Sequence, residues 1–458
     1  MNKVTLLFAT LVLSLTAHAA YNQAPPNFSY QNGKAVFVDI KTSNVEITFD
    51  LDKKTATAVS VLDFYAEKAG HPIIDLVPNP TLIEVNGVET TSELAMDPDK
   101  QTTVRVIQGE ISPGHHQIRI KHLLTTNVAF TDTGVASGFW MSDLNDRRYL
   151  EQYLPANFEF DQFQMNIKVN ILGSNASHLL KANGAVTQTS ANTFEIEFPS
   201  YYSASSFYFH LFPDKSSVAE VQFYYRSIDG RLIPVDIYTN AAAKPIQDFV
   251  ADTKSIMAEL EADYGPWPHD QLIVYGNSLS GGMEHSGATA TSLSALGHEL
   301  FHSYHARALM PANGNAGWMD EAIARFRDNK YPLLQSLSFS STKLAGHSIW
   351  SRMTDRMAYT EGSAFLSWIA FRMNEKGMSF KAFLRDYFEK YKYQTVTTEL
   401  FQRELTIASG LDLSKDFDRY IYGKGAVSTP QKRMHHHEEN PMHPRYSKEE
   451  LLNLTLLK

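Results

Sequence analysis

The stretch His298-Glu299-Leu300-Phe301-His302 decides how the rest of the chain is interpreted. Residues four apart on a helix lie above one another, so His298 and His302 can present two imidazoles to one metal ion. Glu299 lies about 100° around the helix, where it can reach a water beside the metal without being a ligand. A catalytic zinc needs a third protein ligand, and Glu321 is the candidate, with eighteen residues between it and His302. The segment Trp318–Phe326 predicts the opening of a second helix around Glu321.

Two further motifs flank this stretch in the chain. Gly281-Gly282-Met283-Glu284-His285 lies upstream, and Tyr359-Thr360-Glu361-Gly362 lies downstream. With 17 histidines in the chain, an HExxH pattern can arise by chance on an ordinary amphipathic helix. The two flanking motifs, each in its place, favour a zinc site over that interpretation.

Together these motifs resemble the gluzincin metallopeptidases of the aminopeptidase N and leukotriene hydrolase family. That family has HExxH, eighteen residues and Glu, preceded by Gly-Ala-Met-Glu-Asn and followed by Tyr-Glu-Lys-Gly. Tyr264-Gly265-Pro266-Trp267-Pro268 also resembles its Phe-Gly-x-Tyr-Pro sequence. His285 replaces the family's Asn, and the segment Gly281–His285 is in that respect similar to the Gly-Gly-Leu-Glu-His of the glycyl aminopeptidases. The substrate preference therefore stays open.

The resemblance implies a role for each residue that would carry the reaction. His298, His302 and Glu321 are expected to hold one Zn2+, and Glu299 is the expected general base. Tyr359 is expected to donate a hydrogen bond to the oxyanion. The gap between Glu321 and Tyr359 is shorter than is usual in the family, so Tyr331 remains the alternative donor.

The resemblance also implies residues that bind the substrate and support the metal. Glu284 is expected to bind the free α-amine of a peptide, and Gly281 and Gly282 to lie on an edge strand that pairs with the substrate backbone. Asp328 follows Glu321 by two helical turns. It either accepts the second ring N–H of a zinc-bound histidine or faces solvent.

These roles favour a zinc metallopeptidase, and specifically an aminopeptidase that removes N-terminal residues from peptide substrates. Two alternatives remain. The first is a zinc endopeptidase or another hydrolase of the same fold, and the second is an inactive, peptidase-like binding protein. The complete ligand set together with Glu299 argues against the second alternative. The net charge of −9 and the absence of a long basic run argue against nucleic acid as a partner.

The N-terminus predicts a secretory signal peptide over residues 1–19. Lys3 precedes the apolar run Val4–Thr16, and Ala17-His18-Ala19 forms a small-x-small cleavage site. The thirteen residues of that run are too few to span a bilayer as a helix. We therefore expect a periplasmic or secreted protein without stable membrane insertion, with an uncleaved anchor as the alternative. The chain contains no cysteine, which excludes thiolate zinc ligands.

The expected fold class is α+β, with three parts after the signal peptide. Residues 20–212 predict an all-β domain, because alternating runs such as Val45–Phe49 and His116–Ile120 are separated by turn signals. By resemblance this is the family's saddle-like N-terminal domain, followed over residues 213–424 by a thermolysin-like, mainly helical catalytic domain with short C-terminal helices. Residues 425–458, which include His435-His436-His437, predict a polar tail. The expected strands and helices of the second part are Ile233–Tyr238, Ala243–Asp263, Gln271–Tyr275, a zinc helix to about Met310, Trp318–Lys330, Thr360–Lys376, Ser379–Tyr391, Thr397–Ser409 and Ser414–Tyr422.

Overall fold

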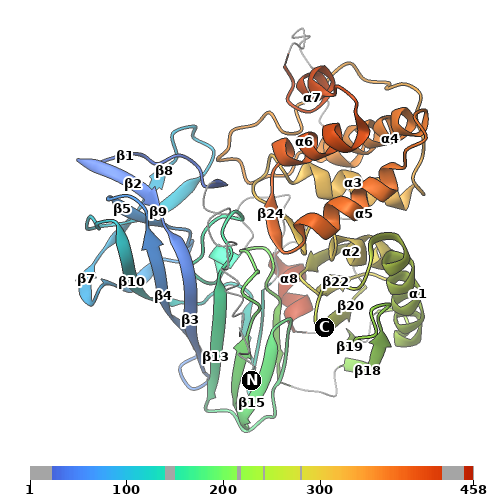
Figure 1. Ribbon diagram of the computed structural model, residues 1–458. Coiled ribbons are helices and arrows are strands. Elements are labelled where there is room, and N and C mark those ends of the chain that lie inside the picture. Colours follow the sequence, from blue (N-terminus) through green and yellow to red (C-terminus); the bar gives the residue numbers. More distant parts are fainter. Residues whose placement is uncertain are drawn as a thin grey trace, which may run out of the picture.

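The computed structural model describes residues 23–139, 150–213, 218–240, 243–278, 281–424 and 448–456 (Figure 1). Strands form the N-terminal region up to residue 213, and a sheet with helices forms the region that follows. The mixed α and β class and the N-terminal β region are thus confirmed. The predicted signal peptide lies outside the described residues.

An eight-stranded sheet dominates the N-terminal region. Its long strands alternate buried and exposed side chains, as a sheet with one covered face requires, and β13 (Gln164–Leu172) runs parallel to β3 (Asp39–Asp50). Strand β13 begins only at Gln164, because Asp161 and Asn157 hold the preceding segment against Ile40 and Val38 by hydrogen bonds. In spatial order the strands are β15 (Ala185–Ser190), β16 (Thr193–Glu197), β13 (Gln164–Leu172), β3 (Asp39–Asp50), β4 (Thr55–Ala66), β10 (Gly114–Leu123), β6 (Pro80–Val85) and β7 (Val88–Thr90).

Two smaller sheets complete this region. The five-stranded sheet contains β1 (Phe28–Tyr30), β2 (Gly33–Phe37), β5 (His71–Ile74), β9 (Thr103–Ile107) and β8 (Ser92–Met96). The four-stranded sheet contains β11 (Val128–Phe130), β12 (Val135–Gly138), β17 (Phe209–Phe212) and β14 (Leu179–Ala182).

The second region begins with a five-stranded sheet, so the expectation of a mainly helical catalytic domain is only partly right. The sheet runs in the order β18 (Val218–Arg226), β19 (Leu232–Asn240), β20 (Leu272–Gly276), β22 (Ala288–Thr291) and β21 (Gly282–His285), with β21 at an edge. The helices are α1 (Ile246–Tyr264), α2 (Leu296–His302), α3 (Trp318–Asp328), α4 (Glu361–Asn374), α5 (Phe380–Tyr391), α6 (Thr398–Ser409) and α7 (Ser414–Tyr420). They share one hydrophobic core with β19 and β20.

The zinc helix is shorter than the sequence predicts, and its expected extension to about Met310 is wrong. Helix α2 ends at His302, and the chain turns before Leu309–Pro311, which forms strand β23. This strand pairs in parallel with β24 (Gln394–Val396), and its tertiary pairing draws the chain away from the helix axis. Pro311 has no N–H to continue a helix, which is consistent with this exit.

The last described residues, Lys448–Thr455, form helix α8, which the prediction of a polar tail did not include. Figure 1 shows α8 (red) beside the junction of the two regions, where it packs on β11, β12 and β17. Leu454 is buried there with Tyr208 of the N-terminal region and Tyr275 of the second region. Among the described helices, none is long and apolar enough to cross a membrane.

Candidate metal centre and active site

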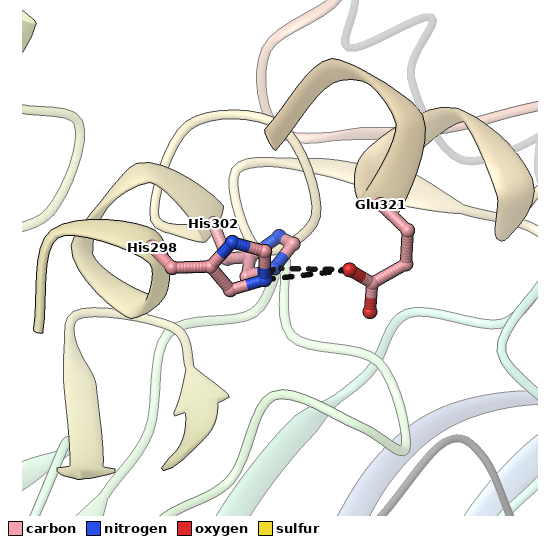
Figure 2. Close-up of side chains that lie close together, drawn as sticks. All are labelled: His298, His302 and Glu321. Carbon is pink, nitrogen blue, oxygen red and sulfur yellow. Dashed lines mark hydrogen bonds and ion pairs between the residues drawn. The ribbon is translucent and has the colours of Figure 1, made fainter. Parts of the chain in front are cut away.

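The structure brings His298, His302 and Glu321 together at one buried point (Figure 2). The two Nε2 atoms of the histidines lie 3.1 Å apart. Glu321 Oε2 lies 3.4 Å from His298 Nε2 and 3.7 Å from His302 Nε2. All three side chains are excluded from solvent.

Apolar packing explains why these side chains converge. Helix α2 packs on α1, α3 and β21, and its Leu300 and Phe301 belong to the hydrophobic core. Helix α3 places Ala322 and Phe326 in the same core. With their apolar residues committed to the core, the two helices present the histidines and the glutamate to each other.

The three residues fit a zinc ion. Zinc ligands lie at about 2.0–2.2 Å from the metal, so two ligand atoms of a tetrahedral site are about 3.3–3.6 Å apart. The measured separations of 3.1, 3.4 and 3.7 Å are close to that spacing. Two imidazoles and one carboxylate are also a donor set that zinc uses in catalytic sites, where a fourth position is left for water or substrate.

Asp328 supports this site from behind His298. Its Oδ2 lies 2.8 Å from His298 Nδ1, so the Nδ1–H can be donated to the carboxylate and Nε2 is left to face Glu321. Burial alone would lower the pKa of His298, but its hydrogen bonds to Asp328 and Glu321 hold this pKa well above the ordinary value. Burial raises the pKa of Asp328, but the hydrogen bond to His298 and the nearby positive charges lower it by more, so the net change is downward. The site therefore favours positive charge at its centre.

The side chain of Glu299 extends from helix α2 toward the edge strand β21. Its side chain is buried, and a Cβ atom built at Gly282 would lie 2.6 Å from Glu299 Cγ. Only glycine leaves room for the glutamate there. Gly281 has φ +86°, a left-handed conformation that favours glycine. The sequence predicted glycines for the approach of a substrate backbone, and the structure shows a second requirement, the space beside Glu299.

Glu284 lies on β21 opposite Thr289 and is 1% exposed. Its Oε1 accepts a hydrogen bond from Arg307 Nη2 at 2.5 Å, in a buried ion pair. Sequence reasoning did not single out Arg307. No local pattern signals it, because the pair joins residues 23 positions apart and depends on the turn that follows α2.

The two tyrosines considered as oxyanion donors lie in different places. Tyr359 ends the 3₁₀ helix η4 (Arg356–Tyr359), which packs against α3, the helix of Glu321. Tyr331 donates to Asp263 at 2.7 Å, and its hydroxyl lies 3.0 Å from that of Tyr264. Tyr331 is thus engaged with the end of α1, which favours Tyr359 of the two.

No protein-family model and no curated protein sequence matches the chain. Solved structures do match. An M1 zinc metallopeptidase from Deinococcus radiodurans superposes with a TM-score of 0.61 at 15% identity, over 88% of this chain and 97% of that one. A variant of that Deinococcus enzyme has been crystallised with a Tyr-Ser-Ala substrate.

Two larger enzymes match over part of their length. The aminopeptidase A of Legionella pneumophila, solved with aspartic acid, matches with a TM-score of 0.62 at 16% identity, over 83% of this chain and 49% of that one. The leukotriene A4 hydrolase of Saccharomyces cerevisiae matches with a TM-score of 0.62 at 12% identity, over 86% of this chain and 69% of that one. At these identities the likeness is one of fold, and it agrees with the resemblance that the motifs carry. The chain therefore has the gluzincin fold of the M1 zinc metallopeptidases.

Proposed function

We propose that this protein is a zinc metallopeptidase of the aminopeptidase type, which hydrolyses the N-terminal residue of peptides. The observation that carries the proposal is the buried triad His298, His302 and Glu321 with Glu299 on the same helix. The fold shared with M1 zinc metallopeptidases supports it.

The chemistry divides between the metal and the residues around it. A zinc ion bound by the triad supplies a Lewis acid that polarises the peptide carbonyl and acidifies water. Glu299 accepts the proton of the attacking water and then delivers it to the leaving amine. Its buried position beside Gly282 restricts the positions that the carboxylate can take. Glu299→Gln, which removes this carboxylate and keeps its shape, should therefore lower kcat by about 10²–10⁴-fold without releasing zinc.

Tyr359 is the proposed partner of the oxyanion. A phenol stays neutral at pH 7 and can donate a hydrogen bond to the negative oxygen that develops during attack. The 3₁₀ helix η4, which ends at Tyr359, packs against α3, the helix that carries Glu321. This placement supports the role that the sequence motif implied.

Glu284 is the proposed ligand of the substrate's α-amine. It lies two residues after Gly282 on the same strand, so both residues face the side of the sheet on which Glu299 lies. A peptide that pairs with this edge strand beside Gly282 would bring its N-terminal residue near Glu284, and the scissile bond would follow that residue. Among the solved structures of the same fold, one holds a Tyr-Ser-Ala substrate and one holds aspartic acid.

An endopeptidase is the second candidate, and one observation favours it. The Glu284 carboxylate is already paired with Arg307, so part of its charge is compensated before any substrate arrives. A site that does not bind the α-amine would hydrolyse internal peptide bonds as well as the bond after the N-terminal residue.

One experiment separates the two candidates. We expect kcat/KM for a free peptide to exceed that for the same peptide with an acetylated N-terminus by about tenfold or more, since the loss of one partner of a buried ion pair costs about 2 kcal/mol or more. If the enzyme cleaves the acetylated peptide internally as fast as it cleaves the free peptide, it is an endopeptidase and not an aminopeptidase.

Export is the remaining part of the proposal. Lys3, the apolar run Val4–Thr16 and Ala17-His18-Ala19 support a cleaved signal peptide and a periplasmic or secreted location. N-terminal sequencing of the protein recovered from cell fractions tests it. We expect a mature chain that begins at Ala20 outside the cytoplasm, and a cytoplasmic chain that retains Met1 would contradict export.

A further inference from the structure

Arg307, in the turn after α2, is bonded both to the edge strand β21 and to the N-terminal region. Its Nε donates to the main-chain oxygen of Glu284 at 3.3 Å, and its Nη2 donates to Glu284 Oε1 at 2.5 Å. Its Nη1 donates to Ser205 Oγ of the N-terminal region at 3.0 Å. The guanidinium thus ties the edge strand β21 to the turn after α2 and to the N-terminal region. Both charged side chains of the pair are at least 95% buried, since 5% of Arg307 and 1% of Glu284 are exposed.

The burial of this pair makes the cation important for the neighbouring carboxylate. A carboxylate that is buried without a cation tends to take up a proton, with pKa increases of up to about 3–5 for fully buried groups. A guanidinium remains charged at every relevant pH and stabilises the ionised carboxylate. The fork of Arg307 also fixes the orientation of the glutamate, because it holds the main-chain oxygen and the carboxylate of the same residue.

An ionised and oriented carboxylate binds an ammonium group, and a protonated carboxyl binds it poorly. The guanidinium also repels an incoming ammonium, which opposes recognition. Without the guanidinium, a pKa increase of about 3–5 from the ordinary value of about 4.3 would leave between roughly a third and under a hundredth of such buried carboxyl groups ionised at pH 7. Arg307 is therefore expected to support amine binding on balance.

We propose that Arg307 is a positioning residue that sets the specificity of the site for a free peptide amino terminus, by holding Glu284 ionised and fixed on the edge strand β21. The inference rests on the proposed function, because it requires that Glu284 binds the α-amine. It goes beyond that function by assigning the preference for unblocked peptides to a pair of residues, of which the arginine never touches the reacting atoms.

A double-mutant cycle tests the inference. The wild type, Arg307→Met, Glu284→Gln and the double variant are each assayed with one peptide in its free and acetylated forms. The measured quantity is the ratio of kcat/KM for the free peptide to kcat/KM for the acetylated peptide. Arg307→Met should lower this ratio by about tenfold or more, since its partner is a buried charge. In the Glu284→Gln background the same substitution should leave the ratio unchanged.

Two further variants separate specificity from general damage. Arg307→Lys keeps a positive charge and should retain most of the ratio, whereas Arg403→Met removes an arginine whose side chain is 62% exposed and should not change it. Zinc content and circular dichroism are measured for every variant. If Arg307→Met does not fold, Arg307→Gln takes its place in the cycle, because it removes the charge and keeps a hydrogen-bond donor.

The possible results are distinct. A folded, zinc-loaded Arg307→Met enzyme with the wild-type ratio would overturn the inference, and so would a change of equal size in the Glu284→Gln background. Either result leaves the aminopeptidase proposal intact if the wild type discriminates between the two peptides. A wild type that cuts both peptides equally well overturns the inference and the aminopeptidase assignment together.

Discussion

Gly282→Ala introduces a single methyl group at the point where the edge strand β21 meets the proposed general base. The new Cβ would lie 2.6 Å from Cγ and 2.8 Å from Cδ of Glu299, and 2.7 Å from Thr291 Oγ1. Real Cβ atoms do not tolerate contacts below 3.0 Å, so either the strand or the glutamate must move. The displacement needed is a few tenths of an ångström or more, next to groups that are all buried.

We expect this displacement to affect catalysis more than stability. Overpacking a buried site costs about 1–3 kcal/mol. A general base contributes about 10²–10⁴-fold to the rate, and a misplacement of about 1 Å can cost 10²-fold. Gly282→Ala should therefore fold, retain its zinc and lose about two orders of magnitude in kcat.

The assay is kcat on a short peptide, with zinc content measured on the same sample. Gly33→Ala is the matched control, because Gly33 also opens a strand and a Cβ built there would lie 3.6 Å from the nearest atom, an ordinary contact. The control should keep wild-type kcat. Wild-type kcat in Gly282→Ala would refute the placement of Glu299 as the base beside β21, and loss of zinc in that variant would show that the methyl group disturbs the metal ligands.

Three further predictions concern residues outside the reacting centre. Asp328→Asn should weaken zinc binding by about 10–100-fold through the loss of the carboxylate that orients His298, as measured by competition with a chelator, and unchanged affinity would remove its supporting role. Burial raises the pKa of Asp161 from 3.8 to about 7. Between these pH values the folded state keeps a proton that the unfolded state has released, so the stability from this proton is fully present below about pH 3.8 and is lost as the pH rises through 7. At pH 8 Asp161→Asn should therefore have a free energy of unfolding up to about 4 kcal/mol above that of the wild type, measured by urea denaturation, and this difference should disappear near pH 4. A difference that does not depend on pH would contradict the raised pKa. Arg352→Met should destabilise the protein by about 3–5 kcal/mol, because Arg352 pairs with the buried Asp75, Glu151 and Glu159, while the exposed Arg403→Met should cost under about 1 kcal/mol, and equal costs would refute the importance of burial.

Much of the fold and of the candidate site could be predicted from local patterns. The i, i+4 spacing of His298 and His302 specifies the ligand face of a helix without any knowledge of the rest of the chain. The same holds for the alternating strands of the N-terminal region and for helix starts such as Ser379, whose side chain accepts from the N–H of Ala382. In each case the deciding interaction joins residues close in sequence, so the pattern contains it.

The missed features depend on contacts between distant residues. The end of α2 at His302 follows from the pairing of Leu309–Pro311 with Gln394–Val396, more than eighty positions away. Arg307 and Glu284 meet only because the turn after α2 passes the edge strand β21. Helix α8 owes its burial to tyrosines from both regions of the chain. Helical periodicity and motif spacing carry no record of such contacts.

The zinc content of the purified protein shows whether His298, His302 and Glu321 form a metal site. Three samples are compared by atomic emission spectroscopy: the wild type, a variant with alanine at His298, His302 and Glu321, and a variant with alanine at His435, His436 and His437. We expect one zinc ion per chain in the wild type and in the second variant, and none in the first, with peptidase activity only in the samples that contain zinc. A variant without the three ligands that still binds one zinc ion per chain would refute this metal site.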